Sequence, residues 1–191
     1  MKSLMSRALD LAQSAGAQYA DIRVVENRTE SIQVKNGVVE SLNFSDSMGF
    51  GIRVLVNGAW GFSSSRELTA EEIDRVSEQA LEIARASALV RGEKVDLGPP
   101  VSNQGKYVTP VTIDPFTISV EDRLGVLLAA DAEMARVDGV RVRQGNLVLI
   151  REKKWFANTE SAFTEQTIIE TGGGIIATAV GDSEVQTRSY P

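Results

Sequence analysis

Hydrophobic positions at the start of the chain recur every three or four residues, which is the spacing of one helical face. The stripe consists of Leu4, Ala8, Leu11, Ala12 and Ala15. We therefore expect a first helix from about Ser3 to Ala15, followed by Gly16 in the left-handed conformation that often ends a helix. The same periodicity, preceded by a capping residue, predicts a second helix from Thr69 to about Ser87 and a third from Ser119 to about Val137.

Between the first two helices, hydrophobic and polar positions alternate as they do on a half-buried strand. Asn36-Gly37 and Asn57-Gly58 each separate two alternating runs, and an Asn-Gly pair tolerates the positive φ angles of a type I′ turn. Residues 19–65 therefore predict a meander of four or five antiparallel strands. Beyond Gly139 the alternation predicts strands at Val140–Val142, Leu147–Ile150, Lys154–Asn158, Thr164–Glu170, Gly174–Val180 and Glu184–Ser189.

These elements predict an α+β fold, in which antiparallel β-meanders have three helices packed against them. Residues 92–115 show little periodicity and contain Pro99, Pro100, Pro110 and Pro115. Because prolines interrupt both helices and strands, this segment is the best candidate for a linker. It would divide one N-terminal α+β domain, residues 1–191, into subdivisions 1–91 and 116–191.

The two strand regions share a pattern of glycines. A shift of 123 positions superposes three pairs, namely Gly16 and Gly139, Gly51 and Gly174, and Gly58 and Gly181. Glycines at equivalent helix ends and turns are what two related helix-plus-meander halves require. The alternative is that two unrelated helix-plus-meander units align at a few positions.

Composition and charge exclude several classes of protein. The chain is 42% hydrophobic with a net charge of −6, and its densest basic group, Arg151, Lys153 and Lys154, is interrupted by Glu152. Nucleic-acid-binding proteins show a basic face, so we expect no direct nucleic-acid partner. Asp10 precedes any apolar run long enough for a signal peptide. The longest apolar stretch, Gly125–Ala130, is far shorter than a membrane span, so we expect a cytoplasmic protein without a membrane partner.

The absence of histidine and cysteine limits the chemistry of this chain. Zinc and iron sites generally use imidazole or thiolate ligands. Catalytic triads need a histidine as the base. We therefore expect no catalytic, cofactor-binding or metal-binding residue in this chain.

Several short patterns suggest chemistry but have simpler structural explanations. Gly172-Gly173-Gly174 precedes a strand rather than a helix, so a turn or bulge is favoured over a phosphate site. Gly49-x-Gly51 lacks the following helix and third glycine of a dinucleotide site. The pairs Glu71-Glu72 and Glu121-Asp122 fall in first helical turns, where the helix dipole favours negative charge.

Aromatic and charged residues of the strands have two possible roles. Trp60, Phe62 and Trp155 are expected mainly in the core, although they could also line a peptide groove. Arg53 should face away from Ile52 and Val54 and pair with a carboxylate. The polar strand Glu184–Ser189, with Tyr190-Pro191, is expected at a sheet edge that either accepts an added peptide strand or is covered.

Four stretches, taken in order, resemble the TldD/PmbA family of metallopeptidases. The glycine-rich double strand from Gly49 to Ser64 resembles the family's G-x-G-[IV]-R run and its following G-[FW]-[AS]-[ST] strand. The hairpin from Ser31 to Ser41 and the helix from Thr69 to Ser87 resemble the elements beside that sheet. The ending, Gly181 to Pro191, is more similar to the TldD branch than to the PmbA branch.

The resemblance implies what the rest of the protein does. In the family, a His-Glu-x-x-x-His helix and a further cysteine hold the metal, and no position here matches them. We therefore expect an N-terminal, non-catalytic fragment, with zinc in an absent C-terminal domain. The resemblance also implies small or unfolded peptides as substrates and a homo- or hetero-oligomer with a related subunit. The alternatives are a stand-alone β-sheet interaction module and a structural partner of an active subunit.

Overall fold

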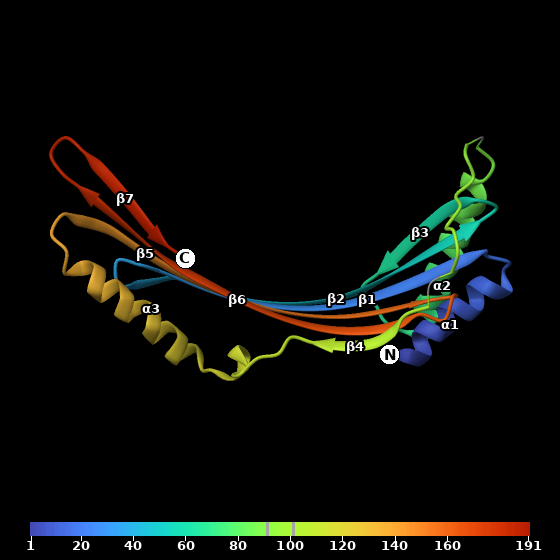
Figure 1. Ribbon diagram of the computed structural model, residues 1–191, viewed down its shortest axis with the longest axis horizontal. Coiled ribbons are helices and arrows are strands. Elements are labelled where there is room, and N and C mark those ends of the chain that lie inside the picture. The colour runs from blue at the N-terminus through green and yellow to red at the C-terminus, as the bar shows by residue number, and fades with distance from the viewer. Residues whose placement is uncertain (91, 101) are drawn as a thin grey trace. The chain divides into compact units, whose positions relative to one another are not determined.

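The computed structural model describes residues 1–90, 92–100 and 102–191 and confirms the α+β fold (Figure 1). Its helices are α1 (Lys2–Ser14), α2 (Ala70–Ser87), α3 (Val120–Ala135) and the short 3-10 helix η1 (Pro115–Thr117). Its strands are β1 (Tyr19–Lys35), β2 (Val38–Val56), β3 (Ala59–Ser65), β4 (Gln104–Val108), β5 (Val140–Asn158), β6 (Phe163–Val180) and β7 (Val185–Tyr190). The three predicted α-helices are confirmed to within two residues at each end.

The described strands form one sheet in the order β3-β2-β1-β5-β6-β4, and β7 also pairs with β6. The chain divides into two compact units. Unit 1 consists of Met1–Glu26, Ser47–Val108 and Glu152–Thr167, and unit 2 consists of Asn27–Asp46, Thr109–Arg151 and Ile168–Pro191. Each unit therefore takes one part of every long strand and has its own helices.

The order of elements repeats along the chain. Helix, two long strands and one short strand occur as α1-β1-β2-β3 and again as α3-β5-β6-β7. With the predicted shift of 123 positions, β1 falls on residues 142–158, where β5 lies, and β2 falls on residues 161–179, where β6 lies. Gly16 and Gly139, which follow the two helices, have the same φ of +84°. The element bounds thus support two related halves.

The two predicted Asn-Gly turns are confirmed. Asn36, Gly37, Asn57 and Gly58 all have positive φ angles, as a type I′ turn requires at both central positions. These turns connect β1 to β2 and β2 to β3. Residues 19–65 form three strands, so the expected number of four or five is wrong, because β1 and β2 are each longer than the alternating runs suggested.

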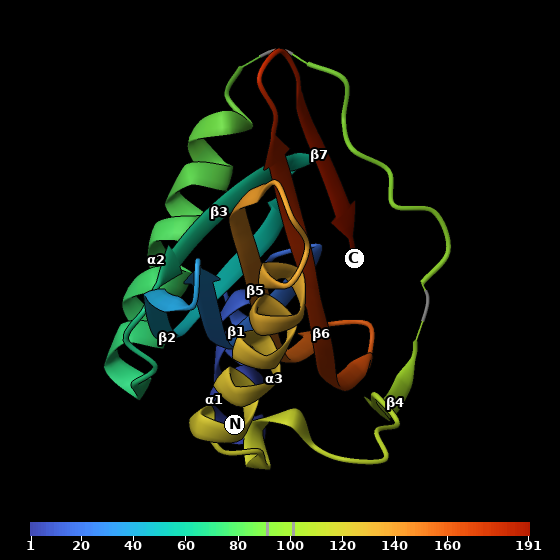
Figure 2. The same ribbon diagram turned by 90° about the vertical axis from the view of Figure 1, so that its left-hand side faces the viewer.

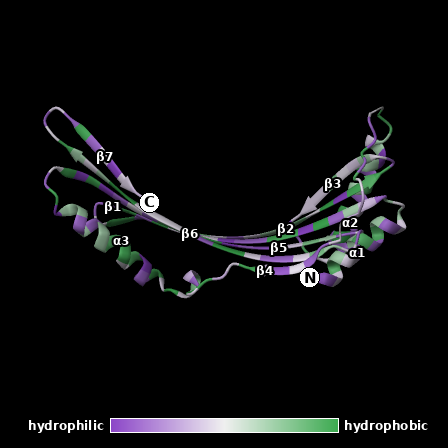
Figure 3. Ribbon diagram, viewed as in Figure 1, coloured by the Kyte–Doolittle hydropathy of each residue, from purple (hydrophilic) through white to green (hydrophobic). Residues whose placement is uncertain are grey.

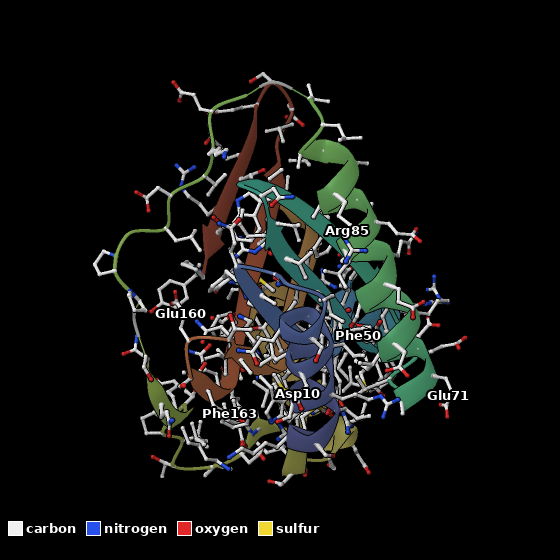
Figure 4. All side chains as sticks on the ribbon, turned by 90° about the vertical axis from the view of Figure 1, so that its right-hand side faces the viewer. Asp10, Phe50, Glu71, Arg85, Glu160 and Phe163 are labelled. Atoms are coloured by element: carbon white, nitrogen blue, oxygen red, sulfur yellow. The ribbon has the colours of Figure 1, made fainter. Side chains whose placement is uncertain are left out.

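In unit 1, α1 and α2 cover one face of the sheet. Phe50, which is 4% exposed, lies between the two helices in Figure 4. The largest fully buried side chains of this core are Met5, Ile22, Val24, Ile52, Val54, Ile73 and Val76. β3 approaches α2 so closely that a Cβ at Gly61 would lie 2.0 Å from the carbonyl oxygen of Ala80. A residue without a side chain is needed at this contact.

In unit 2, α3 covers a smaller core. The buried hydrophobic cluster contains Ile32, Val34 and Leu127, with Leu147 and other half-buried side chains around it. Hydrophobic and hydrophilic residues alternate along α3 (Figure 3). The charged groups Arg123, Asp131 and Glu30 are buried beside this cluster. Ion pairs therefore take a larger share of this interior than of the core of unit 1.

The predicted strands were too short in the second half. One strand, β5, covers three predicted strands, and β6 covers two. The charged residues 151–154 lie within β5, between two predicted strands. They form ion pairs: Arg151 with Asp114, Lys153 with Glu26 and Lys154 with Glu152. Pairing of these charges lets them lie on a strand without an unpaired group in the interior.

The predicted turn at Gly172-Gly173-Gly174 is absent, since all three residues lie within β6. The turn lies earlier, where the side-chain oxygen of Asn158 accepts hydrogen bonds from the backbone N–H groups of Glu160 and Ala162. Such a side-chain-stabilised turn carries no glycine signal.

The expected linker, residues 92–115, contains a strand as well as irregular chain; Val101 within it lies outside the described residues. β4 pairs in parallel with β6, from Gln104 opposite Phe163 to Val108 opposite Thr167. No helix in the described part of the chain is both long enough and apolar enough to cross a membrane.

Candidate functional site

The sheet face of unit 1 that lies opposite α2 carries an aromatic and charged cluster. Gly61 and Ser63 of β3 are buried on the α2 side, so the alternate residues Trp60 and Phe62 point to the other face. Arg53 of β2 lies beside Trp60, with its guanidinium carbon 4.6 Å from the ring centre. The rings of Trp60 and Tyr19 lie at 90° to each other, with 5.8 Å between the ring centres.

Arg53 has the carboxylate partner that the sequence predicted. Its Nε and Nη2 atoms donate to one oxygen of Asp21, at 2.9 and 2.6 Å. The side chain of Asp21 is 5% exposed, whereas that of Arg53 is 43% exposed. The sequence predicted that Arg53 has a carboxylate partner but did not identify it as Asp21, which lies 32 positions away on β1.

Arg53 and Tyr19 of this cluster both have raised pKa values. Burial lowers the pKa of Arg53, but the hydrogen bonds and charge of Asp21, together with Tyr19, outweigh it and raise the pKa, so the guanidinium stays charged. Burial raises the pKa of Tyr19, although the hydrogen bond from Asn158 opposes this change. The phenol therefore stays protonated near neutral pH, and neither group supplies a base.

The expectation that the strand aromatics form the core is correct only in part. Trp155 packs against the core of unit 1, and Trp60 is half-buried. Phe62 is 56% exposed and lies over Gly51, where a Cβ would come within 2.8 Å of its ring. The prediction of a core position for Phe62 is wrong because β3 turns its small residues, not its aromatic ones, toward α2.

Both adjacent carboxylate pairs serve the first turns of helices, as predicted. The hydroxyl of Thr69 accepts from the N–H of Glu72, and the hydroxyl of Ser119 accepts from the N–H of Asp122. The carboxylate of Glu72 pairs with Arg75. Hydrogen bonds from Arg75 and Ser65 lower the pKa of Glu72 to about 2.

Unit 2 contains a buried acid between two arginines. Glu30, whose side chain is 3% exposed, accepts from Arg28 at 2.6 Å and from Arg123 at 2.7 Å. Burial raises the pKa of Glu30, but the hydrogen bonds and positive charges of the two arginines together outweigh it, and the pKa is lowered. Glu30 is therefore charged near neutral pH and is bonded on both oxygens, which makes it a structural group rather than a general base.

Three shallow hollows meet along one short segment of β6 in unit 2. The first, of about 470 Å³, is lined by Asn146, Val148, Gly172, Gly174, Ile176 and Tyr190 among others. The second, of about 600 Å³, adds Ile150 and Ile169, and the third, of about 350 Å³, is lined by Val111, Ile113, Pro115, Ile169 and Thr171 among others. The glycine run, which the sequence assigned to a turn, is the floor of the first hollow.

One part of this chain is similar to a known family of proteins. Residues 20–84 match the family described as PmbA/TldA metallopeptidase domain 1. The similarity to this domain therefore covers 65 of the 191 residues. The match covers β1, β2, β3 and most of α2, which include the glycine-rich double strand and the helix that carried the resemblance.

Curated relatives of this chain are named as metalloproteases. It is 29% identical over 170 residues to a metalloprotease of Methanothermobacter thermautotrophicus, which is 88% of this chain and 36% of that protein. It is 30% identical over 110 residues to a metalloprotease of Archaeoglobus fulgidus, which is 58% of this chain and 24% of that protein. The chain thus spans little more than a third of the length of the first relative.

Solved structures share the fold at low sequence identity. A proposed modulator of a DNA gyrase from Thermotoga maritima matches 99% of this chain and 42% of that chain, with a TM-score of 0.78 and 20% identity. TldE from Thermococcus kodakarensis matches 98% of this chain and 42% of that chain, with a TM-score of 0.69 and 16% identity. The α+β arrangement of this chain is therefore a known one.

The residues of this chain do not fit the metal that the names of its relatives imply. The sequence offers no imidazole and no thiolate. Within residues 1–90, 92–100 and 102–191, no three acidic side chains come together in a group that could hold a metal ion. The buried acids Asp21, Glu30 and Asp131 are each bonded to an arginine instead. We derive no chemical step through a metal in this chain.

Proposed function

We propose that this chain is the non-catalytic N-terminal region of a longer metallopeptidase of the TldD branch. Its role is to support the part of the protein that carries the metal and to wall the space that admits the substrate. The substrates are small or unfolded peptides. The enzyme works in the cytoplasm, as a homo- or hetero-oligomer with a related subunit, and it holds zinc outside residues 1–191.

One combination of observations carries this proposal. The chain aligns with proteins named metalloproteases over only a third of their length. Its own side chains lack the nitrogen and sulfur ligands that zinc sites use. A supporting domain explains both the kinship and the missing ligands.

A second role, as a β-sheet interaction module or structural partner subunit, is favoured by exposed apolar side chains on the edge strands. Phe44 of β2 and Tyr190 of β7 are 58% and 75% exposed, respectively. Large exposed aromatic residues are enriched at protein interfaces. The two roles are compatible if the partner is a related subunit of the same peptidase.

The proposal is tested with the gene and the longer protein that it encodes. We expect the reading frame to continue past Pro191 into a His-Glu-x-x-x-His sequence and the purified protein to contain about one zinc per chain. Replacing the two histidines by alanine should remove the zinc and the cleavage of a casein digest. A longer protein without this motif, or one that keeps zinc and activity after the replacement, contradicts the proposal.

A further inference from the structure

We infer that unit 1 binds the C-terminal residue of a peptide, with Arg53 holding the free carboxylate and Phe62 contacting an apolar side chain. This inference deepens the proposed function, on which it rests for the peptide being a substrate. The two residues lie on the sheet face opposite α2, the helix that runs beside β3 in Figure 2. We name the group Arg53, Trp60 and Phe62 the Arg53 site.

The guanidinium of Arg53 is held in one orientation by its neighbours. Its Nε and Nη2 atoms donate to the same oxygen of Asp21, whose side chain is 5% exposed. Its guanidinium carbon lies 4.6 Å from the ring centre of Trp60, and the ring centre of Tyr19 lies 5.8 Å from that of Trp60. An arginine fixed in this way loses little conformational freedom when a ligand binds.

The bond to Asp21 leaves one edge of the Arg53 guanidinium open. Asp21 occupies the edge that is formed by Nε and Nη2, so the edge formed by Nη1 and Nη2 is left. In the described chain, Nη1 donates to no carboxylate and to no backbone carbonyl, and the side chain is 43% exposed. Two parallel N–H groups on a planar guanidinium match the two oxygens of a carboxylate.

A second arginine makes the surroundings of Arg53 positive. Arg23 lies two positions after Asp21 on β1, so the two side chains share one face of the sheet. Arg23 is exposed, its guanidinium carbon lies 5.3 Å from the ring centre of Phe156, and it forms no ion pair in the described chain. Because Asp21 balances only one of the two arginines, the charge that remains favours an anion.

Phe62 places an apolar surface beside this anion site. It pairs directly with Arg53 across β2 and β3, so the two Cβ atoms lie about 5 Å apart on one face. Phe62 is 56% exposed, and its ring lies over Gly51, where a Cβ would come within 2.8 Å of it. The carboxylate and the side chain of a C-terminal residue diverge from one carbon atom. One such residue can therefore reach Arg53 and Phe62 together.

The second half of the chain has the same order of elements without this cluster. The shift of 123 positions places unlike residues on its members: Val142 on Tyr19, Gln144 on Asp21, Ile176 on Arg53 and Ser183 on Trp60. The helix, the two long strands and the short strand form in both halves. The cluster is therefore not required for these elements to form, which favours a role in binding.

The test uses the 191-residue chain and dansyl-labelled Ala-Ala-Phe, with either a free C-terminal carboxylate or an amide in its place. The free acid should bind about tenfold more tightly than the amide by fluorescence anisotropy. In an NMR titration, the free acid should shift the Arg53 Nε–H and Trp60 indole N–H signals. Equal binding of the two peptides, or binding that leaves both signals in place, overturns the inference.

Two matched pairs of variants separate the carboxylate contact from the apolar contact. Arg53→Lys keeps the charge but loses the planar pair of N–H groups, and should weaken binding of the free acid about tenfold, whereas Arg85→Lys on α2 should not. Phe62→Ala should weaken binding of Ala-Ala-Phe about fivefold and leave Ala-Ala-Gly unchanged. Phe44→Ala, at a residue that is 58% exposed, should change neither. Since Phe62 is exposed, its loss tests the site even if Arg53→Lys unfolds the chain, and equal effects of the two phenylalanine variants contradict the inference.

Other occupants of the Arg53 site give different results. If the site takes any acidic side chain, dansyl-Ala-Glu-Phe amide should bind as tightly as Ala-Ala-Phe with its free carboxylate. If another part of the longer protein covers Arg53, the free acid should bind the 191-residue chain but not the longer protein. Either result overturns the inference. Because binding is measured without zinc, carboxylate binding and the zinc content of the longer protein succeed or fail separately.

Discussion

At the residue scale, the closest packing in unit 1 is at Gly61. A Cβ there would lie 2.0 Å from the oxygen of Ala80 and 2.5 Å from the nitrogen of Ala84, both in the backbone of α2. Since a helix backbone cannot move aside like a flexible side chain, Gly61→Ala should separate β3 from α2. We expect it to lower the free energy of unfolding by about 3 kcal/mol, measured by urea denaturation.

The matched control is Gly105→Ala on β4, where a Cβ would meet nothing within 4 Å. It should change the free energy of unfolding by less than about 0.5 kcal/mol. Equal effects of the two substitutions would show that β3 does not lie against α2 as described.

Also at the residue scale, Glu30 makes the stability of the protein depend on pH. Its pKa in the folded chain lies below the ordinary value of 4.5, because Arg28 and Arg123 bond to its charged form despite its burial. The stabilisation is therefore complete above about pH 4.5 and is lost as the pH falls through the lowered pKa. Glu30→Gln should remove this part of the acid dependence.

At pH 7, Glu30→Gln leaves Arg123, whose side chain is 7% exposed, without its charged partner. We expect a loss of about 3 kcal/mol in the free energy of unfolding, measured by urea denaturation from pH 3 to pH 7. Glu133→Gln, in an exposed pair with Arg136, is the control and should cost less than about 0.5 kcal/mol. Parallel pH profiles for wild type and Glu30→Gln would contradict the assignment.

The conformation and contacts of individual residues were predicted correctly where the residues involved lie close together in the sequence. The Asn-Gly turns and the hydroxyl caps of α2 and α3 depend on residues within three positions of each other, and they were predicted correctly. The partner of Arg53 and the two arginines at Glu30 depend on which strands are neighbours. Arg123 lies 93 positions from Glu30, and no local pattern contains that distance.

At the element scale, η1 is held in unit 2 by a phenylalanine between two arginines. The guanidinium carbon of Arg151 lies 4.3 Å from the ring centre of Phe116, and that of Arg28 lies at 5.3 Å. Phe116→Leu keeps an apolar side chain but removes the π face. We expect it to lower the free energy of unfolding by about 1 kcal/mol and to speed amide exchange in residues 115–120.

The control for this element is Ile113→Val, since Ile113 is 67% exposed in the same segment. It should change neither the free energy of unfolding nor the exchange of residues 115–120. If Phe116→Leu behaves like Ile113→Val, the two arginines do not hold η1 in place.

The type and order of the elements were predicted from the sequence better than their lengths. Helices were correct to within two residues because their apolar stripes are continuous. The predicted strands divided β5 at charged residues and β6 at glycines, because such residues often interrupt a strand that is buried on both faces. In this sheet many strand positions are half-buried or exposed, so charges and glycines remain within strands of 19 and 18 residues.

At the scale of the whole molecule, the two halves share the order of their elements but differ in the strand pairing at one edge. β4, which comes from the expected linker, pairs with β6 in the second half. In the first half, β2 pairs with β3 only from Phe50 to Val56 on that edge. Residues 168–174 of β6 are therefore the short remainder of an edge that β4 and β7 partly cover in the described chain.

The central claim at this scale is that residues 1–191 frame a reaction whose metal is held elsewhere. The most direct measurement is the zinc content of the purified 191-residue chain after dialysis against micromolar zinc, determined by mass spectrometry beside a peptidase assay of the same sample. We predict well below one zinc per chain and no cleavage, since histidine and cysteine are absent from the sequence. One tightly bound zinc per chain, together with peptide cleavage, would contradict the claim.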